Sequence, residues 1–385
     1  MLNIQVLNNI SPLGLEKFSK ENYLVSKSDE NPDGILVRSA KLHDIEIGDK
    51  LKAIGRAGAG VNNIPLDKMS EKGVVVFNTP GANANAVKEL VISSMLLASR
   101  NICQAWNYVN ELPLENLKTT VEDGKKHYSG SELPGKTLGI VGLGAIGVEI
   151  ANAASMLGMD VIGYDPSISK KNAWKISSEV EESLSLEELF SKSDFVSFHI
   201  PLVDSTKNLL NAKRIALLPK GCVVINMSRN GIIDEDELIK SLDNGQLNYY
   251  VTDFPIDEKK NHERVIALPH LGASTLEAED NCASMIVKQV KDYLENGNIV
   301  NSVNFPDSKM PRAGEERLAI THRNIPNMVR QITKAIAEED ANIVDMLNKS
   351  KGNFAYTLID IEKEIPNSVI ENIKQVEGIL KVRAL

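Results

Sequence analysis

The chain has 385 residues, of which 42% are hydrophobic and 25% charged, a composition of ordinary globular proteins that excludes disordered and fibrous classes. Its formal net charge of −9, with no dense lysine and arginine cluster, argues against nucleic acid as a partner. The N-terminal MLNIQVLNNI lacks the features of a signal peptide, and no apolar run of about 18 residues occurs. We therefore expect a cytoplasmic protein that does not contact membranes.

The three cysteines, Cys103, Cys222 and Cys282, are widely spaced and have no CxxC or histidine-rich neighbours. This pattern predicts neither a disulfide framework nor a metal site. We expect all three to be small buried apolar residues.

The first 98 residues alternate apolar runs with helix-like segments. The runs are Gly34–Val37, Leu51–Ile54 and Val74–Phe77. This alternation predicts βα units of a parallel sheet. Apolar residues then recur at spacings of three and four over Ala84–Ser99, which predicts a buried helix that leads into the next domain.

The alternation resumes at Gly135 with six more apolar runs. They are Leu138–Val141, Val161–Tyr164, Phe195–His199, Val223–Asn226, Tyr249–Thr252 and Val265–Leu268. Six strands with helical segments between most of them predict a doubly wound domain. A helix from about Thr275 to Asn296 follows and ends at a turn signal.

The last part of the chain has its own pattern. After an irregular segment, Phe305 to Gly314, the order strand, helix, strand, strand, helix, strand predicts a small ferredoxin-like domain. The six elements are Arg317–Thr321, Met328–Glu338, Ala341–Met346, Phe354–Ile361, Val369–Gln375 and Ile379–Arg383.

The predicted fold class is therefore α/β, with two doubly wound Rossmann-like domains and a small βαββαβ domain. The expected boundaries are 1–98 with 275–303 for a substrate-binding domain, 99–274 for a nucleotide-binding domain, 304–314 for a linker and 315–385 for the C-terminal domain.

The stretch VGLGAIG contains the strongest local motif. Gly142, Gly144 and Gly147 follow a predicted strand and open a predicted helix. In this context the first glycine makes a tight turn, the second lets a pyrophosphate approach the backbone and the third lets the helix pack on the strand. The helix N-terminus then faces the negative phosphates.

Asp165 ends the next predicted strand, about 20 residues beyond the glycines. Its carboxylate can accept hydrogen bonds from the ribose hydroxyls and would repel a 2′-phosphate. No arginine follows it directly, because the next residues are Pro166 and Ser167. The motif thus predicts NAD, rather than NADP, as the cofactor.

Two side chains suit the chemistry beside a nicotinamide. His270 in LPHLGAST follows a predicted strand and can move a proton, and Arg229 in INMSRNGIID follows another and offers a permanent forked charge. His199 also follows a strand, but its surroundings offer no carboxylate, which favours a structural role.

These motifs, with HIPL and TDFPIDE, resemble the D-isomer-specific 2-hydroxyacid dehydrogenases over nearly all of residues 30 to 300. The resemblance implies that Arg229 binds the substrate carboxylate and carbonyl oxygen, and that His270 moves the hydroxyl proton while hydride passes to the nicotinamide. Besides the glycines and Asp165, it implies cofactor contacts for Thr79, Ala145, Ile146, Ile200, Asn226, Met227, Ser228 and Asp253.

The family pairs the histidine with a carboxylate, and here the chain departs from the usual DVFxxEP pattern. Counting from Asp253 selects Glu258, whereas counting from Phe254 selects Asp257, and Lys259 replaces the proline. Glu258 is preferred because the family uses glutamate, and Asp257 stays as the alternative.

Two further segments narrow the resemblance to the D-3-phosphoglycerate dehydrogenases. VRSAKL, with Arg38 and Ser39, and IGRAGAGVNNI resemble the substrate loops of that family, which places Arg38 near a phosphate. The tail resembles its serine-binding ACT domain, with His322, Asn324 and Asn342 at the effector positions. The usual RPG after the asparagine is replaced by Ile325-Pro326-Asn327.

The resemblance thus implies NAD-dependent oxidation of 3-phosphoglycerate, no metal, a homo-oligomer and L-serine as an effector. Two alternatives stay open. One is a glyoxylate/hydroxypyruvate or D-lactate type reductase, against which the extra C-terminal residues argue, and the other is a non-enzymatic NAD-sensing corepressor. A purely structural interpretation of the tail, in which Asn342 is a turn residue and His322 only caps a strand, also stays open.

Overall fold

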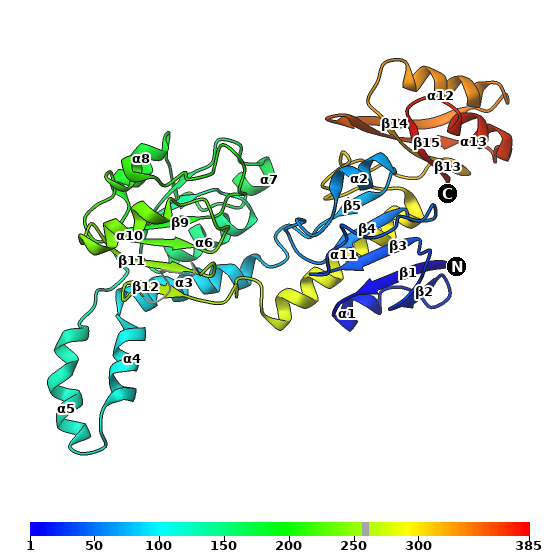
Figure 1. The fold of residues 1–385 in the computed structure, drawn as a ribbon. Helices are drawn as coiled ribbons and strands as arrows, with labels where there is room; N and C mark the ends of the chain where they lie inside the picture. Colours follow the sequence, from blue (N-terminus) through cyan, green and yellow to red (C-terminus); the bar gives the residue numbers. More distant parts are fainter. Residues whose placement is uncertain (256–261) are drawn as a thin grey trace. The chain divides into compact units, whose positions relative to one another are not determined.

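The chain folds into two compact units in the computed structural model, which describes residues 1–255 and 262–385. Unit 1 combines Met1–Ala82 with Glu279–Leu385, and unit 2 is Asn83–Ala278. The long helix α11 (Leu276–Asn296) starts in unit 2 and continues into unit 1. Figure 1 labels the elements, and the predicted α/β fold with a separate small antiparallel sheet is confirmed.

Five parallel strands form the first sheet of unit 1, in the order β2-β1-β3-β4-β5. They are β1 (Leu2–Leu7), β2 (Tyr23–Ser26), β3 (Gly34–Val37), β4 (Ala53–Arg56) and β5 (Val75–Phe77), with the short helices α1 (Pro12–Leu15) and α2 (Leu66–Glu71). The predicted apolar runs correspond to β3, β4 and β5. They leave out β1, in which Asn3 and Gln5 interrupt the apolar residues, and the short edge strand β2.

Helix α11 supplies much of the core of unit 1. Its Ile286, Val287 and Val290 are fully buried. A Cβ atom added to Gly55 of β4 would lie 2.7 Å from Ile286 Cγ1 and 2.9 Å from Val290 Cγ2. The helix therefore contacts the strand backbone directly, and its observed bounds agree with the predicted ones within one residue.

Unit 2 contains a seven-stranded parallel sheet in the order β12-β11-β10-β9-β6-β7-β8. The strands are β6 (Thr137–Val141), β7 (Asp160–Tyr164), β8 (Glu181–Glu182), β9 (Phe195–Phe198), β10 (Cys222–Asn226), β11 (Leu247–Thr252) and β12 (Val265–Ala267). All six predicted strands are present, and the two-residue β8 is an addition at the edge. This order is that of a doubly wound dinucleotide-binding sheet with one more strand.

Unit 2 also contains eight α-helices among the described residues. They are α3 (Ala84–Ser99), α4 (Ile102–Glu111), α5 (Leu117–Gly124), α6 (Ala145–Met156), α7 (Lys170–Ala173), α8 (Leu186–Lys192), α9 (Ala212–Ile215) and α10 (Glu235–Asp243), with a 3₁₀ turn η1 (Lys125–Tyr128). Helix α3 has the predicted bounds, but its Val87, Val91 and Met95 pack in the core of unit 2. The first unit therefore ends near residue 82 and not at the predicted residue 98.

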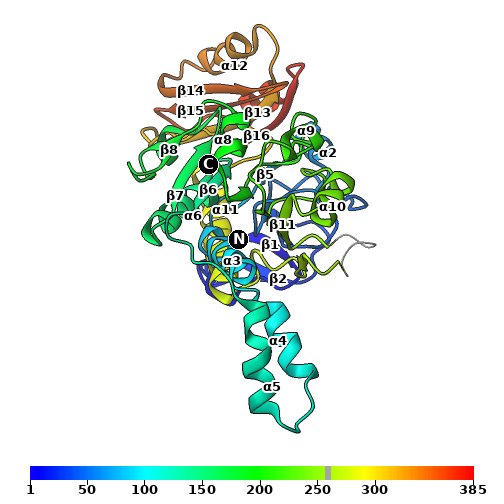
Figure 2. The same ribbon diagram turned by 90° about the vertical axis from the view of Figure 1, so that its left-hand side faces the viewer.

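Helices α4 and α5 form an arm that stands clear of the sheet of unit 2 in both views (Figures 1 and 2). No residue of α4 is buried, and Trp106 on this helix is 67% exposed. Leu114, between the two helices, is 90% exposed. The arm thus presents large apolar side chains to its surroundings.

The C-terminal domain in unit 1 has the predicted βαββαβ order. Its elements are β13 (Glu316–Arg323), α12 (Met328–Ala337), β14 (Ile343–Lys351), β15 (Phe354–Ile361), α13 (Asn367–Lys374) and β16 (Ile379–Ala384). The four strands are antiparallel, in the order β14-β15-β13-β16. Strands β14 and β16 are therefore the two edges of this sheet.

The segment 304–314 forms no helix or strand, as predicted for a linker, yet it is packed in place. Phe305 is fully buried, and Ser308 exchanges backbone hydrogen bonds with Ile299 at 2.7 and 2.8 Å. Tyr356 and Leu358 of β15 belong to the same core cluster as Phe305 and α11. The C-terminal domain thus shares a core with the rest of unit 1.

Arg317 on β13 connects this domain by hydrogen bonds to the segments that precede it in the chain. Its side chain is fully buried and donates to Asp360 Oδ1 at 2.5 Å and Oδ2 at 2.7 Å. Its remaining donors reach the carbonyl oxygens of Asn296, Met310 and Pro311 at 2.8–3.0 Å. All five N–H groups of the guanidinium are therefore used.

The same contacts set the charge of Asp360. Burial acts to raise the pKa of this carboxyl, but hydrogen bonds from Arg317 and the Ala313 N–H outweigh it, so the pKa is lowered. A lowered pKa stabilises the fold above the ordinary aspartate value of about 3.9, and this stabilisation is lost as the pH falls through the folded-state pKa.

We expect Arg317→Met to lower the free energy of unfolding by about 3–5 kcal/mol, because it leaves the Asp360 carboxylate buried without its partner. Urea denaturation measures the change. The matched control is Arg323→Met, which removes an exposed ion pair with Glu71 and should cost no more than about 1 kcal/mol. Equal losses in the two variants would contradict this account of the buried pair.

Candidate active site

The loops that carry the predicted motifs meet at one edge of the sheet of unit 2. The strand order reverses between β6 and β9, which pair in parallel from Leu138 with Phe195 to Val141 with Phe198. The segments after β6, β9, β10 and β11 all leave from the carboxyl ends of their strands. Ligands of doubly wound sheets bind outside this edge, at the point where the order reverses.

The glycine turn after β6 has no room for side chains at two of its three positions. Gly142 has a φ of 98°, and a Cβ there would lie 2.6 Å from the carbonyl oxygen of His199. A Cβ on Gly147 would lie 2.0 Å from the Gly142 carbonyl oxygen. The first glycine thus allows the turn to approach β9, and the third allows α6 to pack on the turn.

Gly144 faces open space instead. No atom lies within 4 Å of a Cβ built on it. It is the N-cap of α6, and no side chain of the described residues accepts a hydrogen bond from the first turn of this helix. Ala145 is exposed and Ile146 is partly exposed. Free N–H groups beside an open glycine fit the pyrophosphate of a dinucleotide.

Asp165 is held against the glycine turn. Its Oδ2 accepts a hydrogen bond from Leu143 N at 2.9 Å, and its Oδ1 accepts one from Ser167 N at 2.9 Å. Each carboxylate oxygen can accept a second hydrogen bond. The carboxylate is therefore fixed in orientation and retains acceptor capacity for ribose hydroxyls.

Hydrogen bonds join the ends of β9 and β10. Ser228 Oγ donates to the Ile200 carbonyl at 2.6 Å, and Asn226 Nδ2 donates to the Arg229 carbonyl at 2.9 Å. Arg229 Nη1 donates to the Ser228 carbonyl at 2.6 Å, and Met227 is buried beside it. This network positions the half-buried guanidinium at the carboxyl edge.

Asp253, after β11, is buried, and only one of its two carboxylate oxygens accepts a hydrogen bond from a described residue. Its Oδ2 accepts from Gly272 N at 3.0 Å, whereas its Oδ1 has no hydrogen-bond partner among the described residues. Burial raises the pKa of this carboxyl, while the Gly272 hydrogen bond and the charges of His270 and Arg229 act in the opposite direction. An unpaired buried acceptor is costly, so Oδ1 is suited to accept a hydrogen bond from a ligand amide.

His270 lies beside Asp253 at the same edge. Its backbone N–H donates to the Asp253 carbonyl at 2.9 Å, and its ring centroid lies 4.8 Å from that of Phe254. Its φ of 23° is unusual for a residue with a side chain. The imidazole is exposed and thus accessible to a substrate.

His199 has the structural role that its sequence context favoured. Its Nε2 lies 2.8 Å from Ser197 Oγ, and burial lowers the pKa of the imidazole to about 3. This ring is therefore neutral near pH 7. The two candidates for the carboxylate beside His270, Glu258 and Asp257, lie outside the described residues.

In unit 1, the predicted substrate and cofactor residues also follow the carboxyl ends of strands. Arg38 follows β3 and pairs with Glu279 at 2.6 Å, and the Ser39 N–H donates to Asn8 Oδ1 at 3.2 Å. Thr79, after β5, is fully buried, and its N–H donates to the Gly58 carbonyl at 3.0 Å.

Arg56 was not singled out from the sequence, although it lies in the quoted IGRAGAGVNNI. It ends β4 and pairs in register with Val37, the residue before Arg38. A Cβ on Gly58 would lie 1.4 Å from its Nη1, so the guanidinium lies over that glycine. The signal that could have revealed it is the position of both arginines at the ends of neighbouring strands.

The three predicted effector residues do not converge within one copy of the C-terminal domain. His322 and Asn324 lie at the end of β13, whereas Asn342 precedes Ile343, which pairs with Ile361 opposite the start of β13. Along β13, Glu316 at the level of Ile343 and His322 are six residues apart, a distance of about 20 Å. The ring of His322 is buried, with Nδ1 2.8 Å from the Arg323 carbonyl and Nε2 2.9 Å from Thr357 Oγ1.

The loop that departs from the RPG pattern keeps a glycine-like backbone. Asn327, at the glycine position, has a φ of 70° and precedes α12. Asparagine is one of the few residues that adopt this left-handed conformation readily. The substitution is therefore compatible with a turn that glycine would make.

Residues 1–255 and 262–385 show neither a metal site nor a membrane-spanning helix. They contain no group of three or more histidine, cysteine, aspartate or glutamate residues placed to hold a metal ion. No helix in these ranges is both long and apolar enough to span a bilayer.

Comparisons with known proteins agree with the geometry. Residues 92–272 match the family described as "D-isomer specific 2-hydroxyacid dehydrogenase, NAD binding domain". The chain is 34% identical over 354 residues to D-3-phosphoglycerate dehydrogenase of Haemophilus influenzae, covering 89% of this chain and 83% of the relative. It is 35% identical to D-3-phosphoglycerate dehydrogenase of Methanocaldococcus jannaschii over 79% of this chain, which spans only 56% of that longer protein.

Among solved structures, NAD⁺-bound 3-phosphoglycerate dehydrogenase of Entamoeba histolytica is similar, with a TM-score of 0.62 and 29% identity. The alignment covers 79% of this chain and 98% of that one. The match to the family model includes the glycine turn, Asp165, Arg229 and His270. The chain thus belongs to the D-isomer-specific 2-hydroxyacid dehydrogenases and is an NAD-dependent oxidoreductase.

Proposed function

We propose that this protein oxidises D-3-phosphoglycerate to 3-phosphohydroxypyruvate with NAD, the first step of L-serine biosynthesis, in the cytoplasm. The observation that carries the proposal is the arrangement of Arg229, His270 and Asp253 at the carboxyl edge of unit 2, beside the glycine turn. The printed names of the relatives supply the substrate.

NAD, when bound, accepts the hydride from carbon 2 of the substrate. The guanidinium of Arg229 would bind the substrate carboxylate and the oxygen on carbon 2 through its forked donors. His270 would accept the proton of the hydroxyl group as the carbonyl forms. The free Oδ1 of Asp253 would accept from the cofactor's carboxamide and orient the ring.

A phosphorylated substrate is supported by unit 1. Arg38 directly follows β3, and Arg56 is the last residue of the neighbouring strand β4. The two strands thus place two guanidinium groups at one edge of that sheet. Guanidinium groups bind phosphate oxygens through paired hydrogen bonds. Ser39 would add a hydroxyl group beside Arg38.

Two other functions use the same fold. A glyoxylate/hydroxypyruvate or D-lactate type reductase would turn over unphosphorylated acids faster than 3-phosphoglycerate. A corepressor that senses NAD would bind NADH and turn over none of them. NADH formation across a panel of D-2-hydroxyacids, with 3-phosphoglycerate expected to have the highest kcat/KM, separates the three.

For the cofactor, we expect Asp165→Ala to weaken NAD binding and to relax the discrimination against NADP, because the ribose hydroxyls lose an acceptor and a 2′-phosphate is no longer repelled. Fluorescence titrations with NADH and NADPH measure both affinities. Asp160→Ala, at the other end of β7, is the matched control. Unchanged ratios of the two affinities would exclude the ribose role.

For proton transfer, we expect His270→Ala to lower kcat by about two to four powers of ten, the usual contribution of a positioned acid or base, while NADH still binds. Steady-state assays and NADH titration give the two readouts. His262→Ala, a histidine paired with Asp243, is the control. A near-normal kcat in the His270 variant would reject the assignment.

The same assay distinguishes the two candidate partners of this histidine. Of Glu258→Gln and Asp257→Asn, the variant with the larger loss of kcat and an altered pH profile identifies the carboxylate that pairs with His270.

A homo-oligomer is supported by two surfaces. The α4–α5 arm exposes Trp106 and Leu114, and β14 is a nine-residue edge strand with unpaired backbone groups on one side. Exposed apolar groups and open strand edges are usually covered by a partner. We propose that a second copy covers both.

Serine binding would then use two copies of the C-terminal domain. Because Asn342 lies about 26 Å from Asn324 along the strand direction in one copy, eight residues at about 3.3 Å each, a two-fold axis beside the edge strand is needed to bring them together. Asparagine side chains offer donors and acceptors that suit an amino acid. The contacts of the His322 ring favour a supporting role for this residue.

We therefore expect Asn324→Ala and Asn342→Ala each to abolish serine binding by the full chain, and a subunit-exchanged mixture of the two to regain about a quarter of the sites. Half of the mixed dimers are heterodimers, and each contains one intact site. Calorimetry counts the sites, with Asn372→Ala as the control on α13. No recovery on mixing would contradict a site shared between copies.

A further inference from the structure

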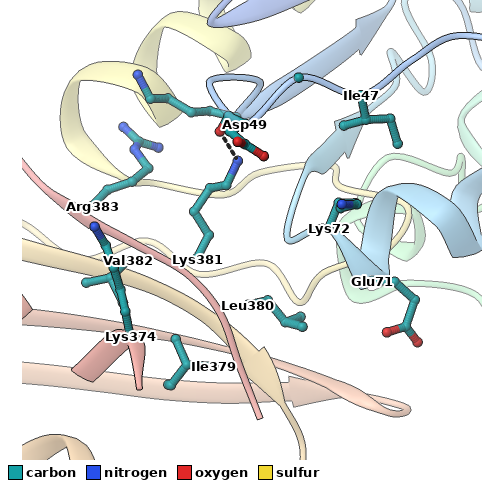
Figure 3. A pocket seen from close by; sticks show the side chains of 12 residues that line it. Ile47, Asp49, Glu71, Lys72, Lys374, Ile379, Leu380, Lys381, Val382 and Arg383 are labelled. Atoms are coloured by element: carbon teal, nitrogen blue, oxygen red, sulfur yellow. Dashed lines mark hydrogen bonds between the residues drawn. The ribbon is translucent and has the colours of Figure 1, made fainter. Parts of the chain in front are cut away.

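A cavity of about 460 Å³ lies within unit 1, outside the elements used above. One wall is the segment Ile47–Lys52 with the end of α2, and the other is β16 with the end of α13 (Figure 3). It therefore lies between the first parallel sheet and the C-terminal domain. Its size is within the range of small-molecule sites.

Cationic side chains dominate the lining. Five are lysine or arginine and two are acidic: Lys52, Lys72, Lys374, Lys381 and Arg383 against Asp49 and Glu71. This excess stands out in a chain with a net charge of −9. Glu71 is already paired with Arg323, and Figure 3 shows it pointing away from Lys381.

Several of the cations have partners elsewhere. Lys52 pairs with Asp33, and Lys374 pairs with Glu371. Arg383 is fixed over the Tyr293 ring, 4.6 Å from its centroid, and donates to the Tyr293 and Leu294 carbonyls. Lys72, Lys381 and Arg383 have no acidic partner among the described residues. Because Arg383 is fixed by the ring and the carbonyls, Lys72 and Lys381 are the two cations considered further.

Lys381 is the more confined of these two. Its half-buried ammonium donates to the carbonyl of Asp49 at 3.0 Å, the dashed line in Figure 3. It also donates to the carbonyl of Leu51 at 2.5 Å. Burial first, and then the charges of Lys52, Arg383 and Lys72, lower the pKa of this amine to about 8, while Asp49 opposes them. A desolvated cation among like charges is stabilised by an anion placed against it.

We propose that this cavity binds one small multivalent oxyanion, a phosphate group or a polycarboxylate, between Lys72 and Lys381. The anion would accept hydrogen bonds from both ammonium groups and would be attracted by Lys52 and Arg383. Because Lys72 belongs to the first parallel domain and Lys381 to β16, the bound anion would link the two domains. The residues proposed above to bind serine, Asn324 directly after β13 and Asn342 directly before β14, do not line this cavity, so the two sites are distinct.

Calorimetry on the full chain without substrate tests the site, with sodium phosphate, sulfate or citrate titrated at constant ionic strength against a chloride blank. We expect saturable binding of one anion per chain at this cavity, measured in the Arg38→Met background, which removes the phosphate contact proposed for the substrate. Binding of phosphate and sulfate alone would indicate a phosphate-type site, and binding of citrate as well would indicate a site for carboxylates too. No saturable binding of any of the three would overturn the proposal.

Variants locate the binding. Lys72→Met and Lys381→Met should each weaken the affinity about tenfold or more, the usual effect of losing one charged hydrogen bond. Lys334→Met, on the exposed face of α12, is the matched control and should bind within about twofold of the unaltered chain. Lys72 is exposed, so its variant remains informative if loss of the Lys381 contacts loosens the fold.

Arg229→Gln separates this cavity from the active site. It should leave the anion affinity unchanged, since Arg229 belongs to unit 2. Anion binding that survives both lysine substitutions, or that disappears in the Arg229 variant, would overturn the proposal.

The pH dependence gives an independent readout. Since the lowered pKa of Lys381 is about 8, raising the pH from 7 to 9 should weaken anion binding as the ammonium loses its proton. Below pH 8 the charged form predominates, and near pH 8 binding should take up a proton. This uptake should be absent in Lys381→Met, and uptake that persists in that variant would contradict the role of this lysine.

Discussion

The close approach of the glycine turn to the end of β9 is the constraint on which the active site depends. A side chain at Gly142 would lie 2.6 Å from the His199 carbonyl oxygen, so only glycine allows β6 to turn into α6 at this distance. This glycine turn also fixes Asp165, because the Leu143 N–H that donates to the Asp165 carboxylate belongs to the turn. The open side of Gly144 then faces outward at the edge where the sheet order reverses.

From this turn, backbone contacts extend across the sheet. Ser228 Oγ reaches the Ile200 carbonyl beside β9, Thr252 Oγ1 reaches the Asn226 carbonyl, and the Asp253 carboxylate accepts from the Gly272 N–H. Each bond joins the carboxyl end of one strand, or the loop after it, to the corresponding part of the neighbouring strand. The positions of Arg229 and His270 are therefore set by the parallel sheet, although they lie 41 residues apart in sequence.

Much of this arrangement could be predicted from local sequence, because glycine turns, buried apolar runs and helical periodicity are short-range signals. Helix α3 has the predicted bounds, but its assignment to unit 2 depends on which core its apolar face meets, which periodicity does not encode. The role of Arg56 also needed the register of β3 against β4. The packing of Phe305 in an irregular segment likewise depends on tertiary contacts with β15.

Tertiary contacts also fix the C-terminal domain within unit 1. Arg317 uses every donor of its guanidinium, with three of them on carbonyls of the chain before β13, and Tyr356 packs in the core with Tyr293 and donates to the Gly297 carbonyl. Detaching this domain would break the three hydrogen bonds from Arg317 to these carbonyls and would expose the apolar cluster that Tyr356 shares with Phe305 and Tyr293, a cost above a typical allosteric coupling of about 1–3 kcal/mol. A ligand that bound the C-terminal domain would therefore act on unit 1 as one body and not by releasing a tethered module.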